Sequence, residues 1–391
     1  MNKFKISVAT LFTIFILNIS VEATPDFAVR YNQISCTSCH FSPVGGGPLK
    51  RSGKLFQTSQ FKTNPIDLQN YLSANFLALA YAPENSKTSK GGLGVMAGSV
   101  AVHIPLSEQK NSFLVIENNI AGFAAAPLRD TYLLYNFYKE AEYKFFESLL
   151  VGRFRSPFGL ISNEHRTYTR IQTGTRWFDF ETGVLISGTP NSKIHYDVAL
   201  VNGKNFSGQG LNLGQANEWG SIINIRIMPS FFMFGSSANY YKSVQDEISH
   251  AWSIYSVVSL ARLNYKYFPA TLKFEYSEAK GFNSILNQGN ASDPNYVNSI
   301  LNARSRGLLA RLDWLISEKF TLIYKFDWLT PDSDFPIDIY QRHGFGFRWN
   351  ISPYTYLSFR SEIGKATHPS ENSKLGQLAQ NANFLILEAA F

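Results

Sequence analysis

The amino-acid sequence predicts an all-β protein, a transmembrane antiparallel β-barrel of about 16 strands that follows a short N-terminal segment. Aromatic residues make up 15% of the chain and charged residues only 17%, whereas soluble domains average about a quarter charged residues. Hydrophobic residues recur with a period of two, the spacing of strands, from residue 72 onward. Charged residues recur on the opposite face of these segments, which a packed core could not hold without many buried ion pairs.

Residues 1–23 are expected to be a signal peptide. Lys3 and Lys5 give a positive start, an apolar stretch follows, and Val21-Glu22-Ala23 resembles a cleavage site. The mature segment would then be exported to the periplasm of a double-membraned bacterium. No later apolar run approaches the ~20 residues that a membrane-spanning helix needs.

Residues 24–70 contain the motif Cys36-Thr37-Ser38-Cys39-His40, and its two cysteines are the only ones in the chain. C-x-x-C-H is the pattern of covalent c-type haem attachment. Cys36 and Cys39 are expected to bond the haem vinyl groups, and His40 is expected to be a metal ligand to the iron. One covalent haem c is thus the predicted cofactor. A segment of roughly 45 residues cannot build a sufficient core alone, so we expect the barrel to shelter this haem.

Two other chemistries use paired cysteines. A structural zinc site needs four ligands at characteristic spacings, whereas the six other histidines are scattered along the chain. A thioredoxin-like redox pair needs a βαβ context, which the strand pattern does not offer. The motif and its surroundings therefore favour covalent haem.

The second axial ligand of the iron stays open at this point. A methionine in that position raises the haem potential, and a histidine gives a lower one. His103 and His195 share strand parity with residues that are expected to face the lumen, whereas Met96 has outward parity unless a bulge intervenes. Each of the three also suits an ordinary position in the barrel wall.

Residues 71–391 are expected to form the barrel. In residues 321–328, leucine and aromatic side chains on one face oppose Lys325 and Asp327 on the other. An even number of strands allows the ring to close, which leaves no unpaired edge in lipid. The predicted strands are residues 73–81, 92–104, 112–122, 130–139, 143–154, 178–189, 194–202, 219–228, 231–241, 251–267, 271–279, 305–316, 320–328, 342–350, 354–363 and 382–391.

The connections favour a membrane barrel over a soluble β-sandwich. The turn at Ser317-Glu318 is tight, whereas residues 203–217 and 281–303 are long and rich in Asn, Gly and Ser. Outer-membrane barrels have short turns at one end and longer loops at the other. Phe391 ends an alternating segment, which resembles the recognition signal of bacterial outer-membrane barrels.

The net charge is +7, and it falls to +6 without residues 1–23, which hold two lysines and one glutamate. This excess is either an ordinary surface surplus or the mark of a basic lumen that favours anions or offsets haem propionates. Arg153 and Arg155 are expected in the lumen, either as solvated wall residues or as an anion site. The sequence has no basic cluster interleaved with aromatic residues, so nucleic acid is not an expected partner.

Residues 152–159 and 196–203 resemble strand motifs of Gram-negative porins. Residues 25–56 resemble the N-terminus of the fused monohaem c-type cytochrome–porins of the bacterial outer membrane, a family associated with iron(II) oxidation. The chain departs from that family at Ser52-Gly53-Lys54, where Phe-Gly-Arg is usual, and at Gly45-Gly46-Gly47. The shared residues are Pro25, Phe27, Ala28, Arg30, Cys36, Cys39, His40, Phe41, Pro48, Leu49, Gly53 and Phe56.

The resemblance implies a haem plug at the periplasmic mouth of the barrel or inside its lumen. The haem would take electrons from an extracellular donor such as iron(II) and pass them to a periplasmic cytochrome or other carrier. On this interpretation the protein transfers electrons in the outer membrane, and any Fe(II):cytochrome oxidoreductase activity occurs at the haem without a catalytic acid, base or nucleophile. The alternative is a solute-diffusion porin in which the haem-bearing N-terminus is a plug or gate.

Overall fold

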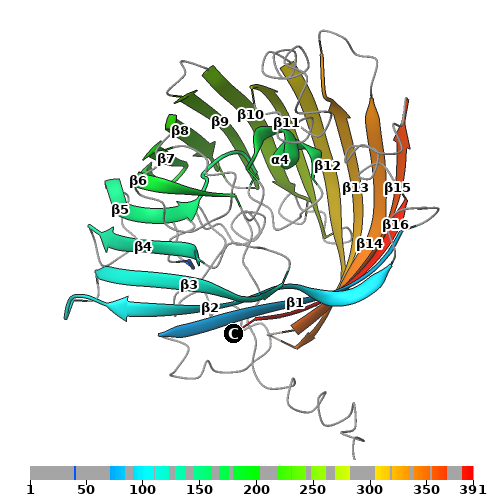
Figure 1. Ribbon diagram of the computed structural model, residues 1–391, viewed down its shortest axis with the longest axis horizontal. Coiled ribbons are helices and arrows are strands. Elements are labelled where there is room, and N and C mark those ends of the chain that lie inside the picture. Colours follow the sequence, from blue (N-terminus) through cyan, green and yellow to red (C-terminus); the bar gives the residue numbers. More distant parts are fainter. Residues whose placement is uncertain are drawn as a thin grey trace, which may run out of the picture.

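The described part of the chain consists of strands and one short helix (Figure 1). The computed structural model describes residues 39–40, 71–83, 91–109, 111–122, 128–137, 144–160, 167–175, 179–202, 218–229, 231–243, 248–260, 269–281, 304–317, 319–333, 339–352, 355–367 and 381–390. The predicted signal peptide, Cys36 and Phe391 lie outside these ranges, as do all other residues of 24–70 except residues 39–40. The strands are β1 (Leu72–Pro83), β2 (Gly92–Pro105), β3 (Ser112–Gly122), β4 (Leu128–Asn136), β5 (Lys144–Arg155), β6 (Phe180–Asn191), β7 (Ile194–Val201), β8 (Glu218–Ile227), β9 (Phe232–Ser243), β10 (Ile248–Ser259), β11 (Ala270–Lys280), β12 (Arg304–Ser317), β13 (Phe320–Thr330), β14 (Tyr340–Ser352), β15 (Thr355–Ala366) and β16 (Ala382–Ala390), and the helix is α4 (Tyr168–Thr173).

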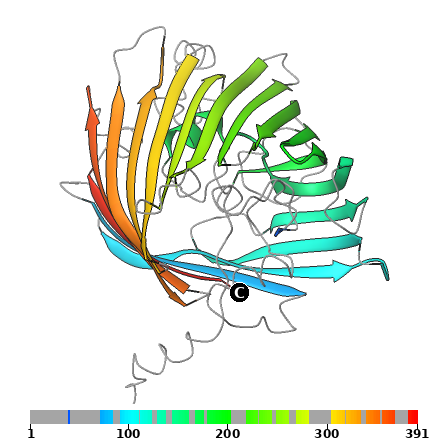
Figure 2. The same cartoon turned by 180° about the vertical axis from the view of Figure 1, so that it is seen from behind.

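The sixteen strands form one closed antiparallel barrel in which each strand pairs with its neighbours in sequence (Figure 2). The ring closes between β1 and β16, with Asn75 opposite Ala390 and Pro83 opposite Ala382. Closure pairs the two edges that an open sheet would leave exposed to lipid. The predicted fold and strand number are therefore confirmed, and each predicted interval overlaps one strand. The largest mismatch is at residues 251–267, because β10 ends at Ser259.

The two faces of the barrel wall differ as the period of two predicts. On β11, outward-facing Leu272 and Phe274 are 42% and 40% exposed, whereas inward-facing Glu275 is 0% exposed. On β13, inward-facing Lys325 and Asp327 are also buried. An apolar outer band with a polar inner wall is the arrangement of a barrel surrounded by lipid. The described residues include no helix that is long and apolar enough to cross a membrane.

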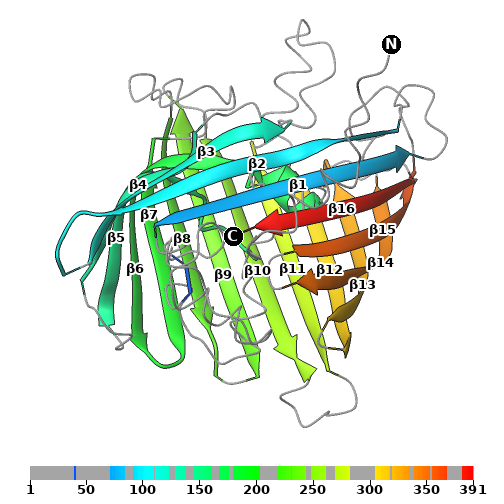
Figure 3. The same cartoon turned by 90° about the horizontal axis from the view of Figure 1, so that it is seen from below.

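The connections at the two ends of the barrel differ in length along the sequence. The strands β1 and β16, where the ring closes, lie side by side in Figure 3. At one end, β12 and β13 are separated only by residues 318–319, and β14 and β15 only by residues 353–354. The strands β1 and β16 begin and end, respectively, at this same end, which we call the short-turn rim. The opposite, long-loop rim carries residues 202–217 and 281–303 between strands. The predicted distribution of tight and long connections is confirmed.

A bulge in β2 changes the orientation that parity predicted for Met96. Leu77 pairs with Ala97 and Ala78 pairs with Val95, so Met96 is an extra residue between them. Such an extra residue breaks the strict alternation of the strand. Met96 is accordingly buried at 9% exposure, so the bulge that would be an exception to its outward parity is present.

Candidate functional site in the barrel lumen

The connection between β5 and β6 turns into the lumen. We call its described residues, 156–160 and 167–175, the inward segment, and every one of them is buried. It includes α4, which packs against β11, β12 and β13 and lies inside the ring in Figure 1. The segment therefore reaches from β5 to the opposite side of the wall and narrows the lumen. The alternation of residues predicted no element here.

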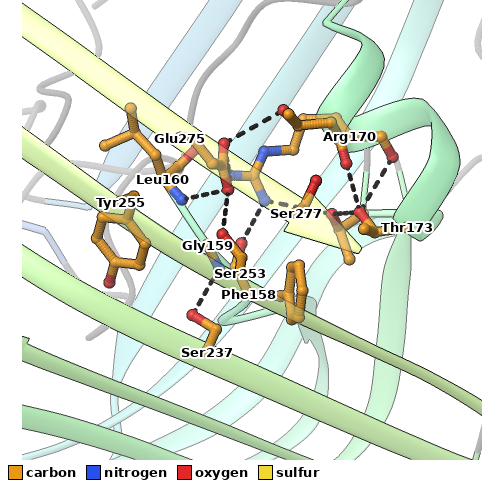
Figure 4. Close-up of polar contacts among 12 residues, drawn as sticks. Phe158, Gly159, Leu160, Arg170, Thr173, Ser237, Ser253, Tyr255, Glu275 and Ser277 are labelled. Carbon is orange, nitrogen blue, oxygen red and sulfur yellow. Dashed lines mark hydrogen bonds and ion pairs between the residues drawn. The ribbon is translucent and has the colours of Figure 1, made fainter. Parts of the chain in front are cut away.

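A buried ion pair fastens the inward segment to the wall (Figure 4). Arg170 of α4 donates hydrogen bonds at 2.6 and 2.7 Å to the two carboxylate oxygens of Glu275 on β11. The Arg170 guanidinium also donates at 2.5 Å to the carbonyl oxygens of Phe158 and Leu160. The side chains of Arg170 and Glu275 are 3% and 0% exposed. One arginine thus ties the helix, the preceding loop and the wall together.

The Glu275 carboxylate also accepts hydrogen bonds from the inward segment and from the neighbouring strand β10. The backbone N–H of Leu160 donates to its Oε1 at 3.1 Å, and the Ser253 hydroxyl donates to the same atom at 2.9 Å. The Thr169 hydroxyl donates to Oε2 at 3.3 Å. Buried carboxylates are stable only when their lone pairs are satisfied in this way. The contact is therefore specific to a carboxylate at position 275.

Gly159 is required at the bend that precedes these contacts. Its φ is +63°, in the left-handed region, where L side chains are rarely found. A Cβ atom at this position would lie 2.1 Å from Glu275 Oε1 and 2.6 Å from an Arg170 guanidinium nitrogen. The Gly159 N–H donates to the Ser237 hydroxyl at 2.8 Å. The chain can pass this close to the ion pair only because residue 159 has no side chain.

The remaining contacts of α4 fix its C-terminal end and its far side. Gly174 ends the helix at φ 59°, and its N–H bonds the Ile171 carbonyl at 3.2 Å, as expected of a left-handed cap. Gln172 donates to the Ser277 hydroxyl at 2.6 Å. The Arg342 guanidinium lies 4.5 Å from the centre of the Tyr168 ring, a cation–π distance.

The β6–β8 part of the wall carries a second polar network. Asp197 accepts hydrogen bonds from Ser187 at 2.6 Å and from Arg226 at 2.9 Å. His195 has one ring nitrogen 3.0 Å from Asp197 Oδ1 and the other 3.1 Å from the Thr189 hydroxyl. His195 and Asp197 are 1% and 0% exposed. The expectation that both face inward is confirmed.

An apolar patch faces inward on the same side of the ring, and we call it the apolar wall. Its strand residues alternate with exposed neighbours, such as Leu133 at 49% and Val151 at 43% exposure, so they point into the lumen. Phe154 and Phe158, at the start of the inward segment, belong to the same cluster. The strand residues of the apolar wall are Phe113, Val115, Tyr132, Leu134, Leu150, Leu185, Ala199, Val201 and Ile222. The same cluster continues onto β9–β11 with Tyr241, Ala251 and Ala279.

Of the three predicted haem residues, Cys39 and His40 are described and Cys36 is not. Residues 39–40 lie inside the ring of strands in all three ribbon views, on the side of β4–β8 (Figures 1–3). His40 is 2% exposed, and Cys39 lies in a turn with intermediate exposure. Within the described ranges, no three His, Cys, Asp or Glu side chains gather in a way that could hold a metal ion. The assignment of Cys36, Cys39 and His40 to haem stays a prediction.

The other residues singled out from the sequence lie in the wall. His103 is 1% exposed, faces inward as expected, and has Nε2 3.4 Å from the Ser73 hydroxyl. Arg153 and Arg155 are each 6% exposed, so they are buried at the end of β5 instead of being solvated. The motif at residues 152–159 is the point where β5 leaves the wall and the inward segment begins.

Comparisons with known proteins bear on the barrel. No protein-family model matches the sequence, and no curated protein matches it. Among solved structures, OprB of Pseudomonas putida gives a TM-score of 0.58 at 9% identity, covering 83% of this chain and 95% of that one. A loop-deletion mutant of OmpT from Vibrio cholerae gives 0.57 at 8% identity, covering 82% and 98%. An anion-selective porin from Comamonas acidovorans gives 0.53 at 8%, also covering 82% and 98%. The fold is therefore that of outer-membrane porins, while the resemblance of residues 25–56 to cytochrome–porins stays a prediction.

Proposed function

We propose that this protein is an outer-membrane channel through which small solutes diffuse, with a lumen narrowed by the inward segment. The closed sixteen-strand ring with an apolar exterior and a polar inner wall supports this proposal most. A closed barrel of this size encloses an aqueous lumen. The buried Arg170–Glu275 pair holds the inward segment in place, so the cross-section open to solutes is fixed by the fold.

The lengths of the connections support one orientation. Short turns face the periplasm and longer loops face the outside in outer-membrane barrels. We therefore place the short-turn rim at the periplasm. The segment that precedes β1 joins the barrel at this rim, which is consistent with its predicted export to the periplasmic side.

Conductance tests the channel. The purified protein, added to a planar lipid bilayer, is expected to produce discrete current steps, and heat-denatured protein should produce none. A barrel that is folded, as judged by a heat-dependent shift in gel mobility, yet never conducts would contradict the proposal.

Electron transfer through a covalent haem is the second candidate function, and the position of His40 favours it. Cys36 and Cys39 would hold the haem by thioether bonds, and the buried His40 would ligate its iron. The residues fit this role, because residues 39–40 lie on the β4–β8 side, where the apolar wall could exclude water from the macrocycle. When bound, haem c supplies reversible one-electron oxidation and reduction. On this proposal, an extracellular donor such as iron(II) and a periplasmic cytochrome or similar carrier are the partners.

The haem itself is tested by staining. Protein produced in a host that matures c-type cytochromes is expected to retain haem peroxidase activity after denaturing electrophoresis, and Cys36→Ala/Cys39→Ala should abolish it. Staining that survives the double substitution would contradict covalent attachment. In liposomes that contain a trapped acceptor, external iron(II) should reduce the acceptor only with the haem-bearing protein. Failure with fully loaded protein would leave the haem-bearing segment as a plug or gate.

A further inference from the structure

The lumen has a wall that is richer in cations than in carboxylates. Apart from Glu275, which is paired with Arg170, and Arg348, the inward-facing charges of β11–β15 are five cations and three carboxylates: Lys273, Arg311, Lys325, Arg342 and Arg360 with Asp313, Asp327 and Glu362. We call this set the basic wall. Its composition was not evident from the net charge of the chain, because the strands must be in register before the charges can be assigned to one side.

Each carboxylate of the basic wall is shared by two cations. Asp313 lies 2.8 Å from the Lys273 ammonium and 2.7 Å from Arg311. Asp327 likewise lies 3.0 Å from the Lys325 ammonium and 2.8 Å from Arg342. Sharing positions the cations without neutralising all of them.

The third carboxylate follows the same pattern. Glu362 lies 3.5 Å from Arg342 and 2.8 Å from Arg360. Arg342 therefore forms ion pairs with two carboxylates, Asp327 and Glu362. The five cations and three carboxylates of the basic wall give it a net charge of +2.

The strand register places like charges directly opposite each other. Lys273 pairs with Arg311, and Arg311 pairs with Lys325, so three adjacent strands present cations in one row. Like charges opposite each other destabilise a sheet. An anion bound at this row would reduce the repulsion between the cations. Anion binding therefore explains the arrangement, whereas a contribution to fold stability does not.

The row of cations lies between the inward segment and the short-turn rim. Glu275, which anchors α4, is two residues from Lys273 on β11, and β11 begins at the short-turn rim. The cations therefore follow the inward segment in the direction of that rim. The side chains of Lys273, Arg311 and Arg360 are 11%, 13% and 15% exposed, whereas Lys325 and Arg342 are 1% exposed. Three cations can thus be reached from the lumen.

The facing side of the ring has the opposite balance among the described residues. On β3–β8, the charged side chains that the structure describes are five carboxylates and four arginines. The carboxylates are Glu117, Asp130, Glu147, Glu181 and Asp197, and the arginines are Arg129, Arg153, Arg155 and Arg226. The positively charged side on β11–β15 and the slightly negative side on β3–β8 thus face each other across the lumen.

We propose that the basic wall binds the carboxylate or phosphate group of small solutes that have passed the inward segment, and makes the channel selective for anions. This proposal rests on the proposed channel function and names its substrate class. Rings of arginine and lysine select anions in pores. A cleft lined by charges of one sign also concentrates counter-ions at its surface.

Reversal potentials in a potassium chloride gradient test the selectivity. The unmodified channel is expected to pass chloride several-fold better than potassium. Lys273→Gln/Arg311→Gln should bring the permeability ratio to about one or below, and Asp313→Asn should raise it. Arg304→Gln/Arg306→Gln is the matched control, because these arginines lie on the outer face of β12 with side chains 46% and 42% exposed.

A triple variant and a binding measurement separate a loss of anion binding from a loss of folding or of conductance. Since Lys273→Gln/Arg311→Gln leaves Asp313 without its cations, Lys273→Gln/Arg311→Gln/Asp313→Asn should show reduced anion selectivity in a stably folded barrel. A cation-selective unmodified channel, or a ratio that the folded triple variant does not change, would overturn the proposal. If the folded barrel does not conduct, the proposed channel function fails. Calorimetric titration with inorganic phosphate then tests whether the basic wall binds anions. Binding that the triple variant loses would support the basic wall, and no binding to the unmodified protein would overturn it.

Discussion

At the scale of single residues, one glycine decides whether the inward segment can reach the wall. Gly159→Ala adds a Cβ that would lie 2.1 Å from Glu275 Oε1, at a left-handed φ of +63°. We expect the substitution to lower the free energy of unfolding by about 1–3 kcal/mol, because it strains the backbone and displaces the ion pair. Urea unfolding in lipid or detergent measures this.

Gly92→Ala is the control, since a Cβ at residue 92 would meet nothing within 4 Å. Its unfolding curve should match that of the unmodified protein. Equal stability of the two variants would show that the bend at Gly159 does not depend on glycine.

The histidines of the lumen should differ in their effect on a bound haem. Both ring nitrogens of His195 already contact side chains, Thr189 on one side and Asp197 on the other. His195→Ala should therefore leave the visible spectrum of the purified haem protein unchanged. His40→Ala should shift it, because the predicted axial ligand is lost. A spectral change with His195→Ala at unchanged haem content would instead make His195 an iron ligand.

At the scale of elements, the described part of the inward segment is held to the wall by one buried ion pair, Arg170–Glu275. Glu275→Gln keeps the shape of the side chain but leaves Arg170 as a buried cation without its carboxylate. Removing one partner of a buried ion pair costs about 3–5 kcal/mol. We expect the segment to detach and become open to protease in limited digestion, while the ring of strands stays intact.

Glu278→Gln provides the matched comparison on the same strand. Glu278 points outward on β11 and pairs with Arg304 and Arg306, whose side chains are largely exposed. Such pairs contribute about 0–1 kcal/mol. Equal protease resistance of Glu275→Gln and Glu278→Gln would show that Arg170 is not the anchor.

The middle of the outer face, away from the charged residues near the long-loop rim, should tolerate apolar residues only. Phe274 is 40% exposed on the outward face near the middle of β11. Phe274→Arg should lower stability in lipid by about 2–4 kcal/mol, because a charge would face hydrocarbon. Phe274→Leu should have a small effect. If folding titrations in lipid vesicles place the two variants together, this face does not contact the membrane interior.

The strands could be predicted from the sequence because each carries its own signal. Alternation in segments such as residues 271–279 depends only on which face meets lipid, so it can be recognised from the residues of that segment alone. The inward segment has no such signal, since its anchor joins Arg170 to Glu275, far away in sequence. Gly159 and the length of the connection were the available hints. The orientation of Met96 could be given only conditionally, because alternation does not show where a bulge interrupts it.

The candidate site divides in the same way. C-x-x-C-H is a local motif, so Cys36, Cys39 and His40 could be named from the sequence. The basic wall could not, because Lys273, Arg311 and Lys325 come together only through the register of three strands.

At the scale of the whole molecule, different parts of the lumen wall have different chemistry. The apolar wall occupies β3–β8, the basic wall occupies β11–β15, and the inward segment runs from β5 to β11–β13. An apolar cofactor and a charged solute would therefore meet different sides of one lumen. On the two proposed functions, a haem attached to residues 36–40 and a diffusing solute would occupy different parts of the same barrel.

Bilayer conductance in the presence of neutral polymers of increasing size tests whether the protein is a solute channel narrowed by the inward segment. We expect discrete current steps, with a size limit for polymer entry that rises in Glu275→Gln because the inward segment detaches. A folded barrel without current steps, or a size limit that Glu275→Gln does not change, would contradict it.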